Sequence, residues 1–184
     1  MKRLFLLVAA VMLATGLSGC GYNTIQQNDE KVIAAWGDVE AAYQRRADLI
    51  PNLVEVVKDY MAYEQETLTR VVAARGAAIQ AKGTAEQAKA ENVLTESLKS
   101  LFAVVENYPD LKANQNVAAL QEELTGTENK ISFARQYYND SVMSFNNMIQ
   151  SIPSNVIASV FNFQPSEYFE AGEEAKAVPK ADLR

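Results

Sequence analysis

The sequence predicts an all-α protein built as an elongated, antiparallel, up-and-down four-helix bundle with a short, aromatic-rich helix near its C-terminal end. Apolar residues recur at intervals of three and four along most of the chain, which is the spacing of one helical face. No alternating run of β-branched residues indicates a strand, and only 8 glycines and 5 prolines punctuate the 184 residues. Amphipathic helices without strands bury their apolar faces against one another, so a bundle is expected.

The composition excludes several classes of function. The chain has no histidine and 1 cysteine, which excludes Ser-His-Asp and Cys-His catalysis, histidine-based metal sites and an internal disulfide. The formal net charge is -6, whereas nucleic-acid binding requires basic patches that neutralise phosphates. We therefore expect no catalytic residues, no metal, no cofactor and no nucleic-acid partner.

The first residues have the pattern of a lipoprotein export signal. Lys2 and Arg3 precede an apolar run over residues 4–13, and this run is shorter than the roughly 20 residues of a membrane span, which favours a cleaved signal over a transmembrane anchor. The tetrad Leu17-Ser18-Gly19-Cys20 resembles the bacterial lipobox, and the resemblance implies lipid transfer to Cys20 and cleavage before it. We predict a signal peptide at 1–19, a helical domain at 20–170 and a flexible polar tail at 171–184.

A lipidated Cys20 predicts the location and the first partner of the protein. Two or more acyl chains hold a protein stably, at about 0.8 kcal/mol per buried methylene, so a palmitate-bearing Cys20 is expected to anchor the mature chain in a membrane of the bacterial cell envelope. Gly21 follows, and resemblance to lipoprotein sorting rules then favours the periplasm-facing inner leaflet of the outer membrane in a diderm. The further partner expected is an envelope or membrane protein.

The first two helices are predicted on either side of a very short turn. An apolar stripe starts a helix near Thr24, and charged residues at 45–48 interrupt it. Because Pro51 is tolerated only in a first helical turn, Asp48 is the expected N-cap of a second helix that runs to about residue 79. The first stripe consists of Ile25, Val32, Trp36, Val39 and Tyr43.

The rest of the chain predicts a loop and two more helices. Residues 80–92 lack an apolar stripe and are expected to form the loop, and a third helix ends near Tyr108 because Pro109 disfavours helical geometry before it. Asn114 or Asn116 can cap the fourth helix, whose stripe continues to residue 152; at about 1.5 Å per residue it spans roughly 57 Å. Pro153 ends it, and residues 156–169 form an aromatic-rich short helix or wrap.

Stretches covering nearly all of residues 22–170 resemble the LemA family in the family's order. The resemblance implies a long antiparallel four-helix bundle, membrane attachment near the N-terminus and no known catalytic residue; many members carry a transmembrane helix where this chain has its lipobox-like tetrad. Gly126 stands where members commonly carry a helix former, so a kink or close packing is expected there. The matching stretches are Trp36-Gly37-Asp38-Val39, Gln44-Arg45-Arg46-Ala47-Asp48-Leu49-Ile50-Pro51-Asn52-Leu53-Val54, Tyr108-Pro109-Asp110-Leu111-Lys112-Ala113-Asn114, Thr127-Glu128-Asn129-Lys130-Ile131, Ala134-Arg135, Tyr138-Asn139, Ile152-Pro153-Ser154-Asn155 and Phe163-Gln164-Pro165.

The densest polar cluster is the first candidate site. It consists of Arg45, Arg46, Asp48, Asn52 and, across an antiparallel bundle, Asn114. Paired arginines suit bidentate recognition of carboxylates or phosphates, so an anionic headgroup or acidic segment is one interpretation. Capping, an ion pair and surface solvation are the structural interpretation, which we favour.

Two further groups of residues have a structural and a functional interpretation. The C-terminal apolar residues either plug the open end of the bundle or form an exposed patch that docks a membrane protein; they include Val160, Phe161, Phe163, Tyr168 and Phe169. Several acids could in principle supply acid-base pairs or an oxygen-ligand metal site, but a solvated helix face explains them better; these are Glu40, Glu55, Glu64, Glu106 and Glu128.

The functional prediction is a non-catalytic, membrane-tethered helical scaffold or adaptor that engages another envelope protein. The alternative is a sensor of anions or small molecules that uses the region of Arg45, Arg46 and Asp48.

Overall fold

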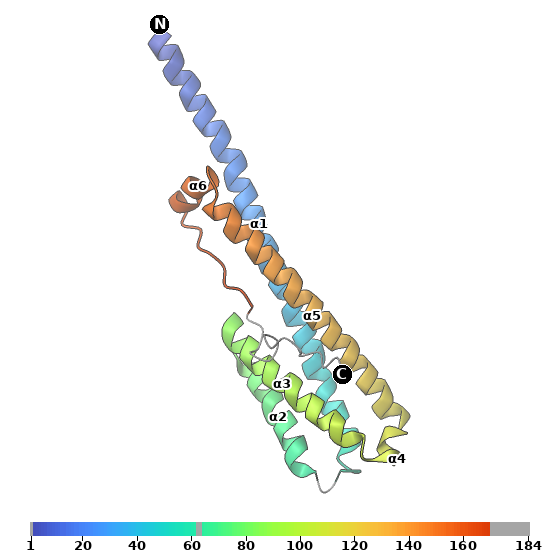
Figure 1. Ribbon diagram of the computed structural model, residues 1–184. Coiled ribbons are helices and arrows are strands. Elements are labelled where there is room, and N and C mark those ends of the chain that lie inside the picture. Colours follow the sequence, from blue (N-terminus) through green and yellow to red (C-terminus); the bar gives the residue numbers. More distant parts are fainter. Residues whose placement is uncertain (1, 62–63, 170–184) are drawn as a thin grey trace, which may run out of the picture. The chain divides into compact units, whose positions relative to one another are not determined.

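A computed structural model describes residues 2–61 and 64–169, with side chains from residue 21 onward. The described part of the chain is helical and contains no strand, which confirms the predicted all-α class. The helices are α1 (Lys2–Val57), α2 (Gln65–Gln80), α3 (Thr84–Val105), α4 (Pro109–Lys112), α5 (Gln115–Gln150) and α6 (Ser154–Val160) (Figure 1). The polar tail predicted for residues 171–184 lies outside the described residues.

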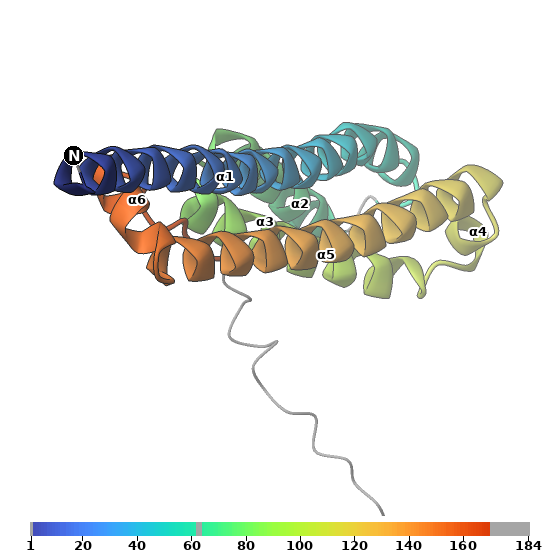
Figure 2. The ribbon, with the colours of Figure 1, turned by 90° about the horizontal axis from the view of Figure 1, so that it is seen from above.

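The chain divides into two compact units, and α1 and α5 each contribute to both. One unit, called here the paired-helix unit, contains the chain up to Asp38 together with Gln136–Tyr168. The other, called the four-helix unit, contains Val39–Arg135 and Phe169. Within each unit α1 and α5 run side by side in opposite directions (Figures 1 and 2).

Contacts between α1 and α5 show the antiparallel arrangement in each unit. In the paired-helix unit the Asn28 Nδ2 donates to the Met148 sulfur at 3.6 Å, and the rings of Trp36 and Tyr138 have centroids 5.2 Å apart. In the four-helix unit the Arg135 Nε donates to the Tyr43 hydroxyl at 2.9 Å, and Arg45 pairs with Glu123. As residue numbers rise along α1, those of the partners on α5 fall, as the sequence predicted for a bundle.

The first predicted turn is wrong, because α1 continues through residues 45–57 without a break. It also begins at Lys2 rather than near Thr24. Pro51 lies inside α1 and has no N–H to donate to the carbonyl of Ala47, four residues earlier. The Arg75 Nε of α2 donates to that carbonyl at 2.6 Å, so a neighbouring helix supplies the hydrogen bond that proline removes. α1 instead ends at Val57, and α2 begins at Gln65.

The loop predicted at residues 80–92 is also wrong for most of its length. Only residues 81–83 are non-helical, and α3 begins at Thr84. Gly83 in this turn has φ +79, a left-handed conformation that glycine adopts without steric cost. Within α3 the buried residues Ala88, Glu91 and Leu94 continue the helical spacing toward its N-terminus. Because Glu91 is charged, these residues do not form a recognisable apolar stripe in the sequence.

The core of the four-helix unit is formed by side chains from every helix that contributes to it. Representative buried residues are Leu53 of α1, Val71 of α2, Leu101 of α3, Leu111 of α4 and Leu124 of α5. Burying such side chains contributes about 1.5 to 3 kcal/mol each. This apolar core fixes the helices that carry the polar cluster described below.

The prediction for α5 is confirmed at its start and along its stripe. Asn114 caps the helix, because its Oδ1 accepts hydrogen bonds from the backbone N–H of Asn116 at 2.9 Å and of Val117 at 3.4 Å. Val117, Leu124 and Ile131 of the predicted stripe are buried. The expected close packing at Gly126 is wrong, because no atom lies within 4 Å of a Cβ built there.

The paired-helix unit contains α6 and the segment that follows it. Ile25 and Val32 of α1, Val142 and Phe145 of α5, and Ala158 of α6 are buried in it. After α6 the chain returns along α5 (Figure 1). This arrangement confirms the predicted short helix and wrap.

Side-chain hydrogen bonds from α5 hold the returning segment. Asn146 donates to the backbone carbonyl of Ser166 at 2.9 Å and accepts from its N–H at 2.9 Å. The Tyr138 hydroxyl donates to the backbone carbonyl of Glu167 at 2.8 Å. Among residues 21–61 and 64–169, no helical stretch combines the length and the hydropathy of a membrane span.

Candidate functional site: a buried charge cluster

Arg46 is the centre of the main polar site, and it lies in the core of the four-helix unit. Its stripe on α1 contains the buried residues Val39, Tyr43, Ile50 and Leu53, spaced three or four residues from their neighbours. Arg46 occupies a core position of this stripe and is 0% exposed. An arginine at such a position requires partners for its charge, because an unpaired buried charge is very costly.

The partners of Arg46 come from α3 and α5. One terminal nitrogen, Nη2, pairs with the Glu91 carboxylate and donates to the Glu91 backbone carbonyl at 3.3 Å. The other, Nη1, pairs with Glu128 and donates to the Thr95 hydroxyl at 2.7 Å. That hydroxyl in turn donates to Glu128 at 3.2 Å. The guanidinium thus links α1, α3 and α5 through charge-assisted hydrogen bonds.

A second arginine extends the same cluster. The Arg135 guanidinium lies 5.3 Å from the centroid of the Tyr43 ring and 4.4 Å from that of Phe169. Besides its bond to the Tyr43 hydroxyl, it donates to the Asn92 side chain at 3.3 Å. Cation–π contacts of this kind contribute about 0.5 to 2 kcal/mol. The formal charges of the two arginines balance those of the two glutamates.

Burial sets the ionisation of the cluster. It raises the pKa of the Glu91 carboxyl, and the charges of Arg46 and Arg135 oppose this effect. Burial also raises the pKa of Tyr43 to about 12, again against the charge of Arg135. The tyrosine is therefore a neutral hydrogen-bonding group at physiological pH.

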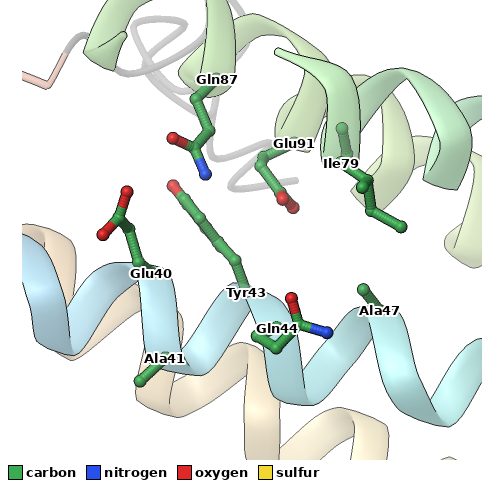
Figure 3. A pocket seen from close by; sticks show the side chains of 9 residues that line it. Glu40, Ala41, Tyr43, Gln44, Ala47, Ile79, Gln87 and Glu91 are labelled. Carbon is green, nitrogen blue, oxygen red and sulfur yellow. The ribbon is translucent and has the colours of Figure 1, made fainter. Parts of the chain in front are cut away.

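A cavity of about 390 Å³ lies beside the cluster, between α1, α2 and α3. In Figure 3 the Tyr43, Gln87 and Glu40 side chains extend toward one another across it, and Glu91 lies on the side of α3. Ala47 and Ile79 form an apolar part of the cavity wall. Of the histidine, cysteine and acidic side chains that the structure describes, no three are grouped to hold a metal ion.

The structure separates the residues of the predicted arginine site. Arg45 is exposed and pairs with Glu123 on the surface, and Asp48 is exposed and accepts a hydrogen bond from Gln44 at 2.7 Å. Asn52 is exposed on α1, whereas Asn114 caps α5. The arginine donors of Arg46 bind carboxylates of the chain itself, so this geometry does not favour an anion site there.

The predicted C-terminal patch divides into buried and exposed residues. Phe163 packs against Phe145, with ring centroids 6.4 Å apart, and Phe169 is buried beside Arg135. Val160, Phe161 and Tyr168 are exposed. The plug interpretation therefore fits Phe163 and Phe169, and the exposed-patch interpretation fits Val160 and Tyr168. Phe161 is partly exposed, but its ring also packs against Tyr22 of α1, with centroids 4.7 Å apart.

Sequence reasoning missed Glu91, Thr95, Tyr43 and Arg135 as members of the site. It assigned Glu128 to a solvated face, and in the structure Glu128 pairs with Arg46. The signal was present in the spacing, because Arg46 and Glu91 stand at stripe positions where apolar residues are expected. Opposite charges at core positions of two helices predict a buried ion pair.

Comparison with known proteins places the chain in a family. The model of the LemA family matches residues 35–182. Magnetosome protein MamQ 2 of Paramagnetospirillum magneticum is 25% identical over 188 residues, which cover 86% of this chain and 69% of that protein. Protein LemA of Metamycoplasma hominis is 24% identical over 171 residues, covering 88% and 75% of the two chains.

A further relative, the magnetosome protein MamQ of Magnetospirillum gryphiswaldense, is 23% identical over 188 residues, with 86% of this chain and 69% of the relative covered. The family match includes every residue of the charge cluster and most of the chain. It agrees with the all-helical architecture and with the resemblance seen in the sequence. The chain therefore belongs to the LemA family.

Proposed function

We propose that the protein is a non-catalytic, membrane-tethered helical scaffold of the bacterial cell envelope, which engages another envelope protein. The main observation in support of a non-catalytic role is that the charged groups of the core neutralise one another. Arg46 pairs with Glu91 and Glu128, and these bonds join three helices. A general acid or base must instead reach the proton it transfers on a substrate.

The proposed tether is a lipid on Cys20, in the periplasm-facing leaflet of an envelope membrane. The tetrad ending at Cys20 supports it, as does a basic and apolar leader of signal-peptide length. Two of the relatives are named as magnetosome proteins. Permanent attachment suits a scaffold, because it confines the bundle to partners at the same surface.

The proposed contact with a partner protein is on the four-helix unit. Phe133 of α5 is 73% exposed, although phenylalanine is usually buried in a folded chain. Aromatic side chains are enriched at the centres of protein interfaces. Phe133 is therefore the anchor that we propose for the partner.

The tether is tested by replacing Cys20 with serine and labelling cells with radioactive palmitate. We expect the wild-type protein to incorporate label and run at the mature size, and Cys20→Ser to stay unlabelled and uncleaved. Persistent labelling of Cys20→Ser would disprove the lipid attachment.

The scaffold function is tested by photo-crosslinking in intact cells. A photoreactive amino acid replaces Phe133, and the neighbouring exposed residue Ser132 serves as the matched control. We expect position 133 to give a reproducible adduct with a protein of the envelope, several-fold stronger than position 132. Equal adducts at both positions, or none in repeated experiments, would contradict the proposal.

A further inference from the structure

The helix α6 contacts α1 at the residues that directly follow Cys20. A Cβ built on Gly21 would lie 2.4 Å from the Cδ1 of Ile157, so the Ile157 side chain rests on the backbone of Gly21. One residue later, the rings of Tyr22 and Phe161 have centroids 4.7 Å apart. Ile157 of α6 and Phe161, the residue that directly follows the helix, are four residues apart and together form the side that packs on α1.

A second side of α6, about 100° around the helix from Ile157, is apolar and exposed. Val156 and Val160 are also one turn apart, and they are 63% and 73% exposed. Ile152, just before the helix, is 86% exposed. Exposed apolar side chains in a cluster mark a contact surface rather than a water-facing one.

No charged residue occurs in either segment that forms this end of the paired-helix unit. The sequence has no Asp, Glu, Lys or Arg between Arg3 and Asp29, and none between Asp140 and Glu167. Elsewhere the chain carries the mixture of charges typical of a soluble surface. A surface without charges can enter the headgroup region of a bilayer without the cost of dehydrating an ion.

We infer that α6 is a second membrane contact, with Val156, Val160 and Ile152 resting in the lipid interface beside the acyl chains of Cys20. The inference rests on the proposed lipid attachment, which brings residue 20 to the headgroups. Gly21 is then at the surface, and α6 lies against Gly21. The contact is driven by the burial of apolar area, and it requires no anionic lipid because the segment has no basic residue.

The test measures the surroundings of single positions in the full lipidated protein. Val156 or Val160 is replaced with cysteine and labelled with an environment-sensitive fluorophore, after reconstitution into phosphatidylcholine vesicles. Acylation protects Cys20 from the label. Ile33→Cys is the matched control, since Ile33 is also apolar and 64% exposed but lies about 20 Å further along α1.

We expect labels at 156 and 160 to show blue-shifted emission and at least threefold stronger quenching by brominated lipid than the label at 33. Adding phosphatidylglycerol should leave this ratio unchanged. Labels at 156 and 160 that are as accessible to water as the label at 33 would overturn the inference. Water access in pure vesicles combined with protection in native membranes would also overturn it, because a protein would then cover α6.

Flotation of the same vesicles separates this inference from the proposed tether. Protein that floats with the vesicles while its α6 labels face water retains the lipid anchor and loses only the α6 contact. Protein that fails to float disproves the tether and, with it, the α6 contact.

Discussion

Arg46 is held in the core by bonds that leave its guanidinium no exposure to solvent. Three helices meet at this one side chain, since it pairs with Glu91 of α3 and Glu128 of α5. Burying an ion pair contributes little net stability compared with apolar packing, but removing one partner leaves an uncompensated charge in the core. Substitutions at Arg46 and at its neighbour Arg45 should therefore have very different effects.

Arg46→Ala is expected to lower the free energy of unfolding by about 3 to 5 kcal/mol, because two carboxylates lose their counter-charge. Arg45→Ala, which removes only an exposed pair with Glu123, should lower it by less than about 1 kcal/mol. Urea denaturation followed by circular dichroism measures both values. Equal losses in the two variants would show that the buried cluster has no special role in stability.

Tyr43 predicts a loss of stability at alkaline pH. Its pKa is about 12 in the folded chain against an ordinary value of 10.0, so the folded state holds the phenolic proton more tightly. The resulting stability is complete below pH 10 and is lost as the pH rises toward 12; two pKa units correspond to about 2 to 3 kcal/mol. The difference in unfolding free energy between wild type and Tyr43→Phe should fall across this range. Parallel pH profiles of the two proteins would contradict the prediction.

At the residue scale, the sequence identified Arg46 as part of a polar site, but it did not identify the side chains that Arg46 binds. Arg45 and Arg46 are adjacent, so a helix directs them to different faces, about 100° apart. The spacing places Arg46 on the core stripe only if the helix continues through residues 45–48, and the predicted turn at these residues obscured that position. Tyr43 and Arg135 are 92 residues apart, and only the packed helices bring them together.

At the scale of elements, the main difference from expectation is the continuity of α1. Charged residues and a proline usually mark a boundary, and here both lie inside one helix. The charge is neutralised by Glu91 and Glu128, and the carbonyl left free by Pro51 is bonded by Arg75. Both compensations come from other helices, so local sequence could not reveal them, whereas the uninterrupted stripe of α5 was sufficient to predict that helix.

The bond from Arg75 to Ala47 predicts coupling between Arg75 and Pro51. Arg75→Met should lower the free energy of unfolding by about 1 to 3 kcal/mol, because it leaves a buried carbonyl without a donor. In a Pro51→Ala background the new N–H of residue 51 can bond that carbonyl, so the same substitution should cost less. A double-mutant cycle should give a coupling energy of at least about 0.5 kcal/mol.

The matched control for this cycle is Arg70→Met. Arg70 is also on α2, but it is exposed and pairs with Glu66, so its cycle with Pro51→Ala should give no coupling. Equal coupling energies for Arg70 and Arg75 would contradict the role assigned to Arg75.

At the scale of the whole molecule, the two units differ in how many helices pack around α5. In the four-helix unit the helix contributes to a core with residues from α1, α2, α3 and α4. In the paired-helix unit it packs against α1 and the segment from α6 onward. Regions with fewer buried contacts open at lower free energy, so one continuous helix should have two levels of stability.

Hydrogen exchange of the purified protein should show this difference directly. We expect backbone amides at 117–134 to exchange at least tenfold more slowly than amides at 137–149 of the same helix. The change should occur near residues 135 and 136, where the units divide. Uniform protection along α5 would show that the two units open as one.

The charge cluster also restricts how the helices can be aligned. If α3 slid along α1 by one helical turn, about 5.4 Å, Glu91 would leave Arg46 and an apolar residue would face the guanidinium. Leu94 and Leu98 could still meet other leucines, because apolar contacts tolerate such a shift. The ion pair does not tolerate such a shift. Arg46 and Glu91 therefore select one alignment of α1 and α3 among several that would bury similar apolar area.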